Sequence, residues 1–531
     1  MVSDDPRSDV AGHGIRLESS RRRTLAIISH PDAGKTTLTE SMALHAALID
    51  EAGAVHGKAS RRAVVSDWME IERARGVSIA SAALKFDYRG TVINLLDTPG
   101  HADFSEDTYR VLTAVDSVIM VIDAAKGVES QTRKLFEVCR RREIPIIAFV
   151  NKWDRPGKDP LELLDEIEHE LGIYPMPLNW PVGIPGDLRG LLERTSEEML
   201  VLDRVPGSAT APAEHRIAAS RVPAEHAAPW AAALEESRLL QAQDYRFDEE
   251  LFTAGAGCAV LFGAAALNFG VRELLEAVVR LAPPPQPPVA LDGTHRPVDG
   301  DLSAVVFKLQ AGMDRAHRDR LAFIRIYSGK FERGMVLTHG PSGRPFTTKY
   351  AHQMVGRDRS TAEIAYPGDV IGLVNASALR IGDTLYVGDP VEYPPMPVFP
   401  PEHFAVATCT DVQRQKQFRR GLDQLAEEGV IQLFHSGSHG PQSPIVGAVG
   451  PMQFEVLEHR MRHELGAAVT LTPLPYTVLR TITGAIADAW AREPGVHLAR
   501  RPHGAGVALF TNEFQAQRLT DRLPHNLRPQ Q

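Results

Sequence analysis

The chain has 531 residues and a formal charge of −9, because 58 Lys and Arg stand against 67 Asp and Glu. With 43% apolar and 24% charged residues, the composition excludes a wholly disordered or fibrous chain. The acidic balance also excludes a uniformly basic coat for nucleic acid. At roughly 150 residues a domain, the length predicts about three domains.

The first 23 residues are polar and end in an arginine run, without the apolar segment of a secretory signal, so we expect a loose arm. The apolar runs, such as 144–150, are far shorter than the ~20 residues that cross a bilayer. The three cysteines lie far apart, which favours a reducing compartment over a disulfide framework. We therefore expect a soluble cytoplasmic protein with no membrane segment. Nothing in the sequence requires more than a monomer.

Two proline clusters, at 283–288 and 390–401, predict extended linkers, because proline lacks the backbone donor that helices and central strands need. The predicted domains are 1–285, 286–395 and 396–531. In the first, apolar strands at 25–28, 92–96, 118–121 and 144–150 alternate with helical patterns, which predicts a doubly wound α/β domain.

The second predicted domain has short strands at 305–310, 321–327 and 370–373 with glycine turns between them, which indicates a small β-barrel. The third mixes helical patterns at 413–428 and 452–463 with a strand at 445–449, which favours a compact α/β unit. The stretch 189–257, rich in Ala, Glu and Arg, gives no clear indication of its role.

A phosphate-binding loop is predicted where the strand at 25–28 passes into a helix. Backbone N–H groups of such a loop hold phosphates, while Lys35 reaches the β and γ groups and the Thr36 hydroxyl can ligate Mg²⁺. The loop departs from the usual pattern in having serine at its first glycine. Its residues are Ser29, His30, Pro31, Asp32, Ala33, Gly34, Lys35, Thr36 and Thr37.

Two further motifs close later strands and point to guanine nucleotides. Asp97 can hold the metal through water, and the backbone N–H of Gly100 can meet a γ-phosphate. In Asn151-Lys152-Trp153-Asp154, the Asp154 carboxylate can accept from the two adjacent N–H groups of guanine, and Asn151 can brace the phosphate loop. Three motifs in order, each at a strand end, predict a GTP site, because open α/β sheets bind ligands there.

These residues resemble those of the translational GTPases. The segment 75–79 is similar to the first switch of that family, with Ser78 in place of the usual threonine, and 97–104 is similar to the second switch with its histidine. The resemblance implies that Ser78 and Thr36 ligate Mg²⁺ and that Asp32 supports a monovalent ion. It also implies that His101 positions the attacking water when the ribosome orders the site, with Lys35 stabilising charge on the phosphates.

The fifth guanine element of that family looks altered here. A hydroxyl residue usually precedes alanine at this position, whereas this chain has Ala264 before Ala265. The backbone N–H of Ala265 could still meet the guanine O6. We therefore expect a modest loss of nucleotide affinity and no loss of base specificity.

Within the translational GTPases, which include elongation factors G and Tu, the chain is most similar to the peptide chain release factor 3 family. The segments that carry this similarity are 29–37, 313–320, 328–330, 365–369, 381–384 and 446–450. The family implies a GTP/GDP switch with Mg²⁺ that acts on ribosomal RNA and proteins. It implies weak intrinsic hydrolysis with strong stimulation in trans, and dissociation of the class I release factor after peptide release.

Three alternatives stay open: a diverged translational GTPase in ribosome rescue or protection, a nucleotide-sensing scaffold without turnover, and a P-loop metabolic kinase. The intact Asn151-Lys152-Trp153-Asp154 counts against the kinase, which would prefer ATP. Two basic groups could meet RNA phosphates or could be solvated faces with internal ion pairs. They are Arg315, His317, Arg318 and Arg320, and Arg414, Lys416, Arg419 and Arg420.

Overall fold

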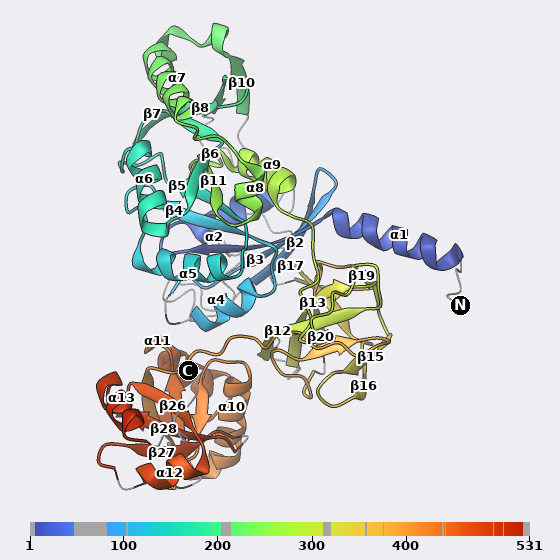
Figure 1. Cartoon of the computed structure of the whole chain (residues 1–531), viewed down its shortest axis with the longest axis vertical. Helices are drawn as coiled ribbons and strands as arrows, with labels where there is room; N and C mark the ends of the chain where they lie inside the picture. Colours follow the sequence, from blue (N-terminus) through green and yellow to red (C-terminus); the bar gives the residue numbers. More distant parts are fainter. Residues whose placement is uncertain are drawn as a thin grey trace.

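The computed structural model describes residues 6–46, 82–101, 103, 105–202, 214–311, 320–355, 358–374, 376–437, 440, 442–491, 493–502 and 504–523. The elements form three units, and the first of these contains an inserted second sheet (Figure 1). Over these residues, no helix combines the length and the apolar character that a membrane span requires. The division of the chain near 285 and 395 stays a prediction.

The first domain is built on a sheet whose described strands run in the order β2-β3-β1-β4-β5-β11-β6. Strand β2 is antiparallel to β3, and the other pairings in the sheet are parallel. This confirms the predicted α/β class. The strands are β1 (Arg22–Ser29), β2 (Ala82–Tyr88), β3 (Thr91–Asp97), β4 (Ser117–Asp123), β5 (Ile146–Asn151), β6 (Tyr174–Pro177) and β11 (Gly257–Phe262).

Helices cover both faces of this sheet because its strands are apolar on both sides. Ile27 packs with Leu38 and Leu274 on one face, whereas Ile28 packs with Leu135 and Leu163 on the other. The helices cover the faces of the sheet and not the carboxyl ends of its parallel strands. The predicted motifs lie at these carboxyl ends, which form one edge of the sheet. The helices are α2 (Lys35–His45), α4 (Ser105–Leu112), α5 (Ser130–Arg141), α6 (Pro160–Leu171) and α9 (Val271–Leu281).

The stretch whose role the sequence left undetermined forms a second, antiparallel sheet between β6 and β11. Its order is β10-β9-β8-β7, and α7 packs on β7 and β8. The indole N–H of Trp180 donates to Glu236 at 2.8 Å and fixes this helix on the sheet. The elements are β7 (Asn179–Ile184), β8 (Asp187–Glu193), β9 (Glu198–Leu202), β10 (Glu214–Ala218), α7 (Ala227–Ala242) and α8 (Glu249–Thr253).

The second domain is the predicted β-barrel. Its described strands form a sheet in the order β16-β15-β21-β12-β13-β20-β17-β18, with β14 paired to β19, around an apolar core. The strands are β12 (Ser303–Ala311), β13 (Arg320–Ser328), β14 (Phe331–Glu332), β15 (Val336–His339), β16 (Arg344–Thr347), β17 (Ala351–Val355), β18 (Asp358–Thr361), β19 (Ile364–Ala365), β20 (Val370–Val374) and β21 (Thr384–Tyr386).

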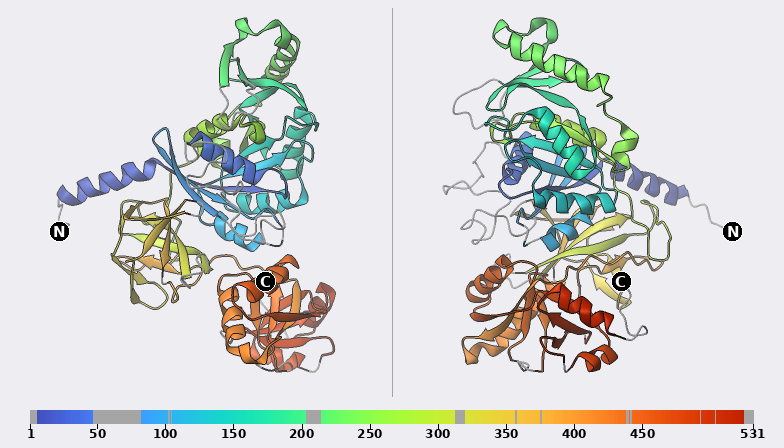
Figure 2. Two further views of the ribbon diagram at one scale, coloured as in Figure 1. Left: turned by 180° about the vertical axis from the view of Figure 1, so that it is seen from behind. Right: turned by 60° about the vertical axis from the view of Figure 1, so that its left-hand side comes forward.

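The C-terminal domain contains two sheets with helices packed on them, as the turned views make clear (Figure 2). Phe418 of α10 and Leu457 of α11 meet in one of its cores. The elements are β22 (His403–Cys409), α10 (Gln415–Glu427), β23 (Gln432–Phe434), β24 (Ile445–Ala448), α11 (Met452–His463), β25 (Val469–Leu474), β26 (Val478–Ile482), α12 (Gly484–Trp490), β27 (His497–Arg500), β28 (Gly506–Phe510) and α13 (Glu513–Asp521).

The prediction of a loose arm at the beginning of the chain was wrong for its larger part. Helix α1 spans Pro6–Ser20 and projects beside the barrel (Figure 1). Its last turn is held by Glu18, which pairs with Arg22 at 2.7 Å and Arg21 at 3.0 Å, and Arg16 pairs with Asp299 at 2.6 Å. These ion pairs stabilise a helix that has no strongly apolar face for a sequence pattern to reveal.

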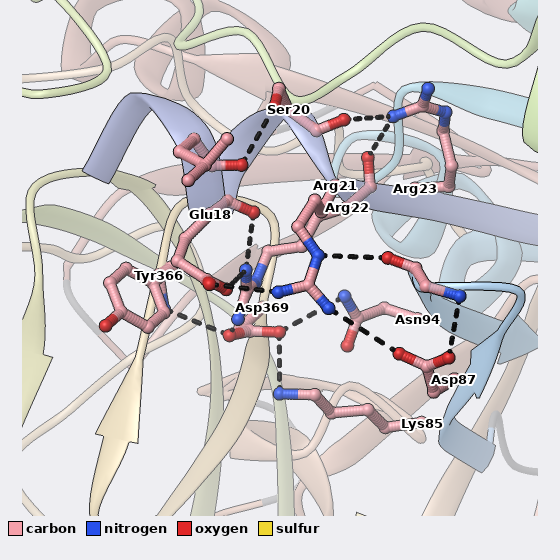
Figure 3. Close-up of polar contacts among 12 residues, drawn as sticks. Glu18, Ser20, Arg21, Arg22, Arg23, Lys85, Asp87, Asn94, Tyr366 and Asp369 are labelled. Atoms are coloured by element: carbon pink, nitrogen blue, oxygen red, sulfur yellow. Dashed lines mark hydrogen bonds and ion pairs between the residues drawn. The ribbon is translucent and has the colours of Figure 1, made fainter. Parts of the chain in front are cut away.

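A cluster of buried charges joins the first domain to the barrel (Figure 3). The Asp369 carboxylate, which is fully buried, accepts from Arg22 on β1 at 3.0 Å, Lys85 on β2 at 2.8 Å and Asn94 on β3 at 3.3 Å. Although burial alone would raise the pKa of Asp369, Lys85 and Arg22 hold it below its ordinary value. Strands that lead to the candidate site are therefore fixed to the barrel.

A second buried ion pair crosses the same boundary. Both carboxylate oxygens of Asp116, which precedes β4, accept from the Arg325 guanidinium of β13 at 2.6 and 2.7 Å. The Arg325 side chain is 1% exposed. Nearby, the Tyr327 hydroxyl donates to the Thr113 carbonyl at 3.2 Å. The barrel is thus fixed on the loop before β4 as well as on the first three strands.

Candidate nucleotide site

The predicted phosphate loop lies between β1 and α2, at the open edge of the sheet. Asp32 and Gly34 both have left-handed backbone conformations, with φ of 66° and 94°. A side chain at Gly34 would clash with the Asn151 amide, so the position requires glycine. Ser29, at the first glycine position of the usual pattern, is buried and donates to the His30 carbonyl at 2.9 Å. The loop enters α2 directly, so the first N–H groups of that helix face the edge.

The lysine of this loop meets the aspartate that ends β3. Lys35 Nζ lies 2.5 Å from Asp97 Oδ1, and both side chains are almost fully buried. Gly100 lies close to Lys35, since a Cβ there would be 3.9 Å from Lys35 Cε. Thr36 is half-buried at the start of α2, whereas Thr37 is exposed. The first two predicted motifs are therefore brought together.

The third motif, at 151–154, holds the phosphate loop through hydrogen bonds to its backbone carbonyls. Asn151, the last residue of β5, donates through Nδ2 to the Ala33 carbonyl at 2.8 Å. Lys152 donates to the Asp32 carbonyl at 2.5 Å and pairs with Asp123 at 2.8 Å. Asp154 is only half-buried, which leaves its carboxylate reachable by a base.

The fifth element is also tied to Asn151. Ala264 follows β11, and the Ala265 N–H donates to Asn151 Oδ1 at 2.9 Å. A contact between this N–H and the guanine O6 stays a prediction, because the N–H is here donated to Asn151. The amide of Asn151 thus joins the phosphate loop to the segment after β11.

His101 lies one residue beyond Gly100, with its side chain 31% exposed. Its Nδ1 accepts from the Asp103 backbone N–H at 3.3 Å and lies 3.2 Å from Asp103 Oδ1. Ser78 and the rest of the first switch segment, together with Ala102 and Phe104, lie outside the described residues. So do 313–319, which hold three members of the first basic group.

Two acidic partners of the site were not predicted from the sequence. Asp123 ends β4 and pairs with Lys152, and Glu129 lies 2.7 Å from His30 Nδ1. Burial works to raise the pKa of Asp123, but hydrogen bonds from Lys152 and the Ala125 N–H lower it. Burial lowers the pKa of His30 despite Glu129. The position of Asp123 at a strand end, like that of Asp97, is the signal that could have found it.

The donor atoms at the site fit Mg²⁺ in their chemistry. A hydroxyl at Thr36 and a carboxylate at Asp97 are hard oxygen ligands, which Mg²⁺ prefers. No group of three or more His, Cys, Asp or Glu side chains arranged for a metal occurs among the described residues. A metal here would therefore depend on the nucleotide phosphates for its other ligands, as in phosphate-loop enzymes.

Three family models match the chain in order. The Elongation factor Tu GTP binding domain covers residues 20–284, Elongation factor G domain 2 covers 301–388, and the Class II release factor RF3, C-terminal domain, covers 393–520. Together they follow the three architectural units described above and associate the phosphate loop with a GTP-binding family.

Relatives match over nearly the whole chain. Peptide chain release factor 3 of Symbiobacterium thermophilum is 46% identical over 513 residues, covering 95% of this chain and 96% of that protein. The protein of the same name from Gloeobacter violaceus is 44% identical over 524 residues, covering 96% and 97%. A solved structure from Thermus thermophilus has a TM-score of 0.69 at 20% identity, over 91% of this chain and 71% of its own, and supports the fold alone.

Proposed function

The chain belongs to the peptide chain release factor 3 family, and from this premise we propose that it drives the class I release factor off the ribosome after peptide release. It is a translational GTPase and a translation termination factor. The match of residues 393–520 to the release factor C-terminal domain carries the proposal, since it separates this chain from elongation factors with the same GTP-binding domain. Because the proposed role is on the ribosome, it is a cytoplasmic one.

In the proposed mechanism, water attacks the γ-phosphorus in line, the bond to the β–γ bridging oxygen breaks, and GDP leaves. Lys35 turns from Asp97 to the β and γ phosphates, and the backbone N–H groups of 32–36 hold their oxygens. His101 orients the water. Mg²⁺, held by Thr36, Ser78 and the water network of Asp97, would neutralise developing phosphate charge. Asp154 recognises the guanine edge, while Asn151 keeps the phosphate loop in register.

Contacts with ribosomal RNA and proteins are part of the proposal. Lys416, Arg419 and Arg420 are exposed on α10 and are candidates for phosphate contacts. Arg414 is engaged within its own domain by Asp411 at 3.5 Å, and Arg320 pairs with Glu427. Only part of the two basic groups is therefore available to RNA in this conformation.

Hydrolysis of GTP and ATP by the purified protein, with and without 70S ribosomes, tests the proposal. We expect GTP-specific stimulation on the order of 10³ to 10⁵-fold. Labelled class I release factor should then leave post-release ribosomes at a rate that rises with GTP. GTP binding without stimulation would favour a non-hydrolysing scaffold, and activity confined to stalled complexes would favour a rescue factor.

The base-recognition step has its own variant. Asp154→Asn should shift preference from guanine towards xanthine nucleotides, because the amide offers a donor where the carboxylate accepted. Competition between GTP and XTP for a fluorescent nucleotide measures the shift. Asp165→Asn, on the exposed side of α6, is the matched control and should leave the preference unchanged. An unshifted Asp154→Asn protein would contradict the role of Asp154.

A further inference from the structure

One carboxylate joins the second switch segment to the C-terminal domain. Asp103 Oδ1 lies 3.2 Å from His101 Nδ1, while Asp103 Oδ2 accepts from the Met452 backbone N–H at 2.6 Å. The Asp103 backbone N–H also donates to His101 Nδ1 at 3.3 Å. The two oxygens of a side chain that is 12% exposed thus contact His101 on one side and another domain on the other.

The partner of Asp103 is the start of helix α11. The first N–H groups of a helix have no partner within it and carry partial positive charge, which suits a carboxylate. Pro451, at the N-cap position of α11, makes no side-chain hydrogen bond to the helix. Asp103, 349 residues away along the chain, therefore provides the cap that the local sequence does not.

The close approach is built into the C-terminal domain as well. A side chain at Gly450 would clash with the Asp103 carboxylate. Elsewhere in the C-terminal domain, a side chain at Gly429 would clash with the guanidinium of Arg110 on α4. The C-terminal domain thus approaches both Asp103 and the helix that follows the second switch, with glycine at each point of contact.

We propose that Asp103 is a positioning residue through which the docked C-terminal domain holds His101 in its resting arrangement. This inference rests on the proposed function, in which His101 orients the attacking water. Displacement of the C-terminal domain removes the Met452 N–H from Asp103 and frees the segment that carries His101. Since coupling between sites is reciprocal, the nucleotide state at 97–101 in turn biases the docking of the C-terminal domain.

The sharpest test changes the C-terminal side alone. Gly450→Ala should push the Asp103 carboxylate off Met452 while leaving the nucleotide site intact. The matched control is Gly484→Ala, at the start of α12, where a Cβ meets nothing within 4 Å. In single-turnover GTP hydrolysis without ribosomes, Gly450→Ala should be faster by about fivefold or more, the lower end of coupling between two sites.

A double variant separates positioning from general loosening. In the His101→Ala background, Gly450→Ala should have no further effect on the hydrolysis rate, because the acceleration passes through His101. Acceleration that persists without His101 would overturn the inference. So would a Gly450→Ala protein whose hydrolysis rate equals that of Gly484→Ala.

Substitutions of Asp103 itself keep the test decisive if Gly450→Ala fails to fold. Asp103→Asn retains an oxygen that accepts from Met452, so it should hydrolyse GTP at close to the wild-type rate, whereas Asp103→Ala should be faster. Equal rates for the two would overturn the inference. If wild-type protein binds GTP but ribosomes do not stimulate its hydrolysis, the proposed function and this inference are overturned together. If ribosomes stimulate the wild type but Gly450→Ala and Asp103→Ala leave the hydrolysis rate unchanged, only this inference is overturned.

Discussion

The GTPase domain contacts the barrel and the C-terminal domain through different chemistry. On the barrel side, two buried carboxylates pair with buried cations across the boundary. Asp369 of the barrel pairs with Arg22 of the GTPase domain, and Asp116 of the GTPase domain pairs with Arg325 of the barrel. On the C-terminal side, a backbone N–H at Met452 meets Asp103 in the second switch segment. The half-exposed Glu427 also joins the end of α10 to the barrel through Arg320 and Arg380.

The difference indicates which joint is fixed and which moves. Parting a buried ion pair leaves charges without partners and costs about 3 to 5 kcal/mol. Parting a single helix cap costs about 1 kcal/mol, and an exposed pair costs still less. The GTPase domain and the barrel should therefore move as one body, while the C-terminal domain detaches at a cost that nucleotide exchange can supply.

The largest expected effect comes from breaking the fixed joint. Asp369→Asn removes the charge that Arg22 and Lys85 face, and should lower the free energy of unfolding by about 3 kcal/mol. Urea unfolding followed by circular dichroism measures it. Glu363→Gln, in an exposed pair with Arg333 on the same barrel, is the control and should change little. A loss below about 1 kcal/mol for Asp369→Asn would contradict the fixed joint.

The pH dependence of the stability lost in Asp369→Asn shows whether the Asp369 carboxylate is the group responsible. Because the pKa of Asp369 is lowered in the folded protein, its stabilising effect is complete above its ordinary value and is lost as the pH falls through the lowered folded value. The stability difference between wild type and Asp369→Asn should therefore be constant from neutral pH down to about pH 5. It should shrink only below about pH 4. A difference that changes around neutral pH would point to another group.

A smaller effect is expected from Arg325→Lys. Lysine keeps the positive charge, but one ammonium cannot replace the two guanidinium nitrogens, of which one donates to the Asp116 carboxylate and the other to the Ala114 carbonyl. Stability should therefore fall by about 2 kcal/mol. Urea unfolding with Arg333→Lys as the exposed control measures this. An unaffected Arg325→Lys protein would show that the charge alone, without the donation to the Ala114 carbonyl, holds this part of the boundary.

The smallest effect on stability should come from the movable joint. Glu427→Gln weakens pairs whose side chains are partly exposed, and should cost less than about 1 kcal/mol. Its effect should appear in small-angle X-ray scattering, as a larger radius of gyration from a looser C-terminal domain. A loss of stability as large as that of Asp369→Asn would erase the distinction between the joints.

The nucleotide site was largely predictable from the sequence because its motifs are local. Asp97 and Asn151 each end a strand, and Lys35 begins the helix after the loop that follows β1. Neighbouring strands of one sheet bring such positions together. The structure places all three within one constellation. The roles given to them and to His101 stay predictions until the variants are measured.

Contacts between distant segments could not be predicted in this way. Nothing in the pattern around Asp103 indicates a partner at Met452, and Asp369 appeared only as part of a segment similar to a family. Helix α1 escaped prediction because ion pairs, and not an apolar stripe, hold it. Local periodicity reports which face of an element is buried, but it carries no information on which distant residue covers it.

The place of β11 in the sheet has a consequence for synthesis of the chain. It lies between β5 and β6, and Asn151 meets Ala265 over a separation of 114 residues. The ribosome must therefore synthesise the whole inserted sheet and α7 before β11 can take its place between β5 and β6. Pairings of such high contact order form slowly. The guanine side of the site should thus be completed only after Ala265 has emerged, long after the phosphate loop.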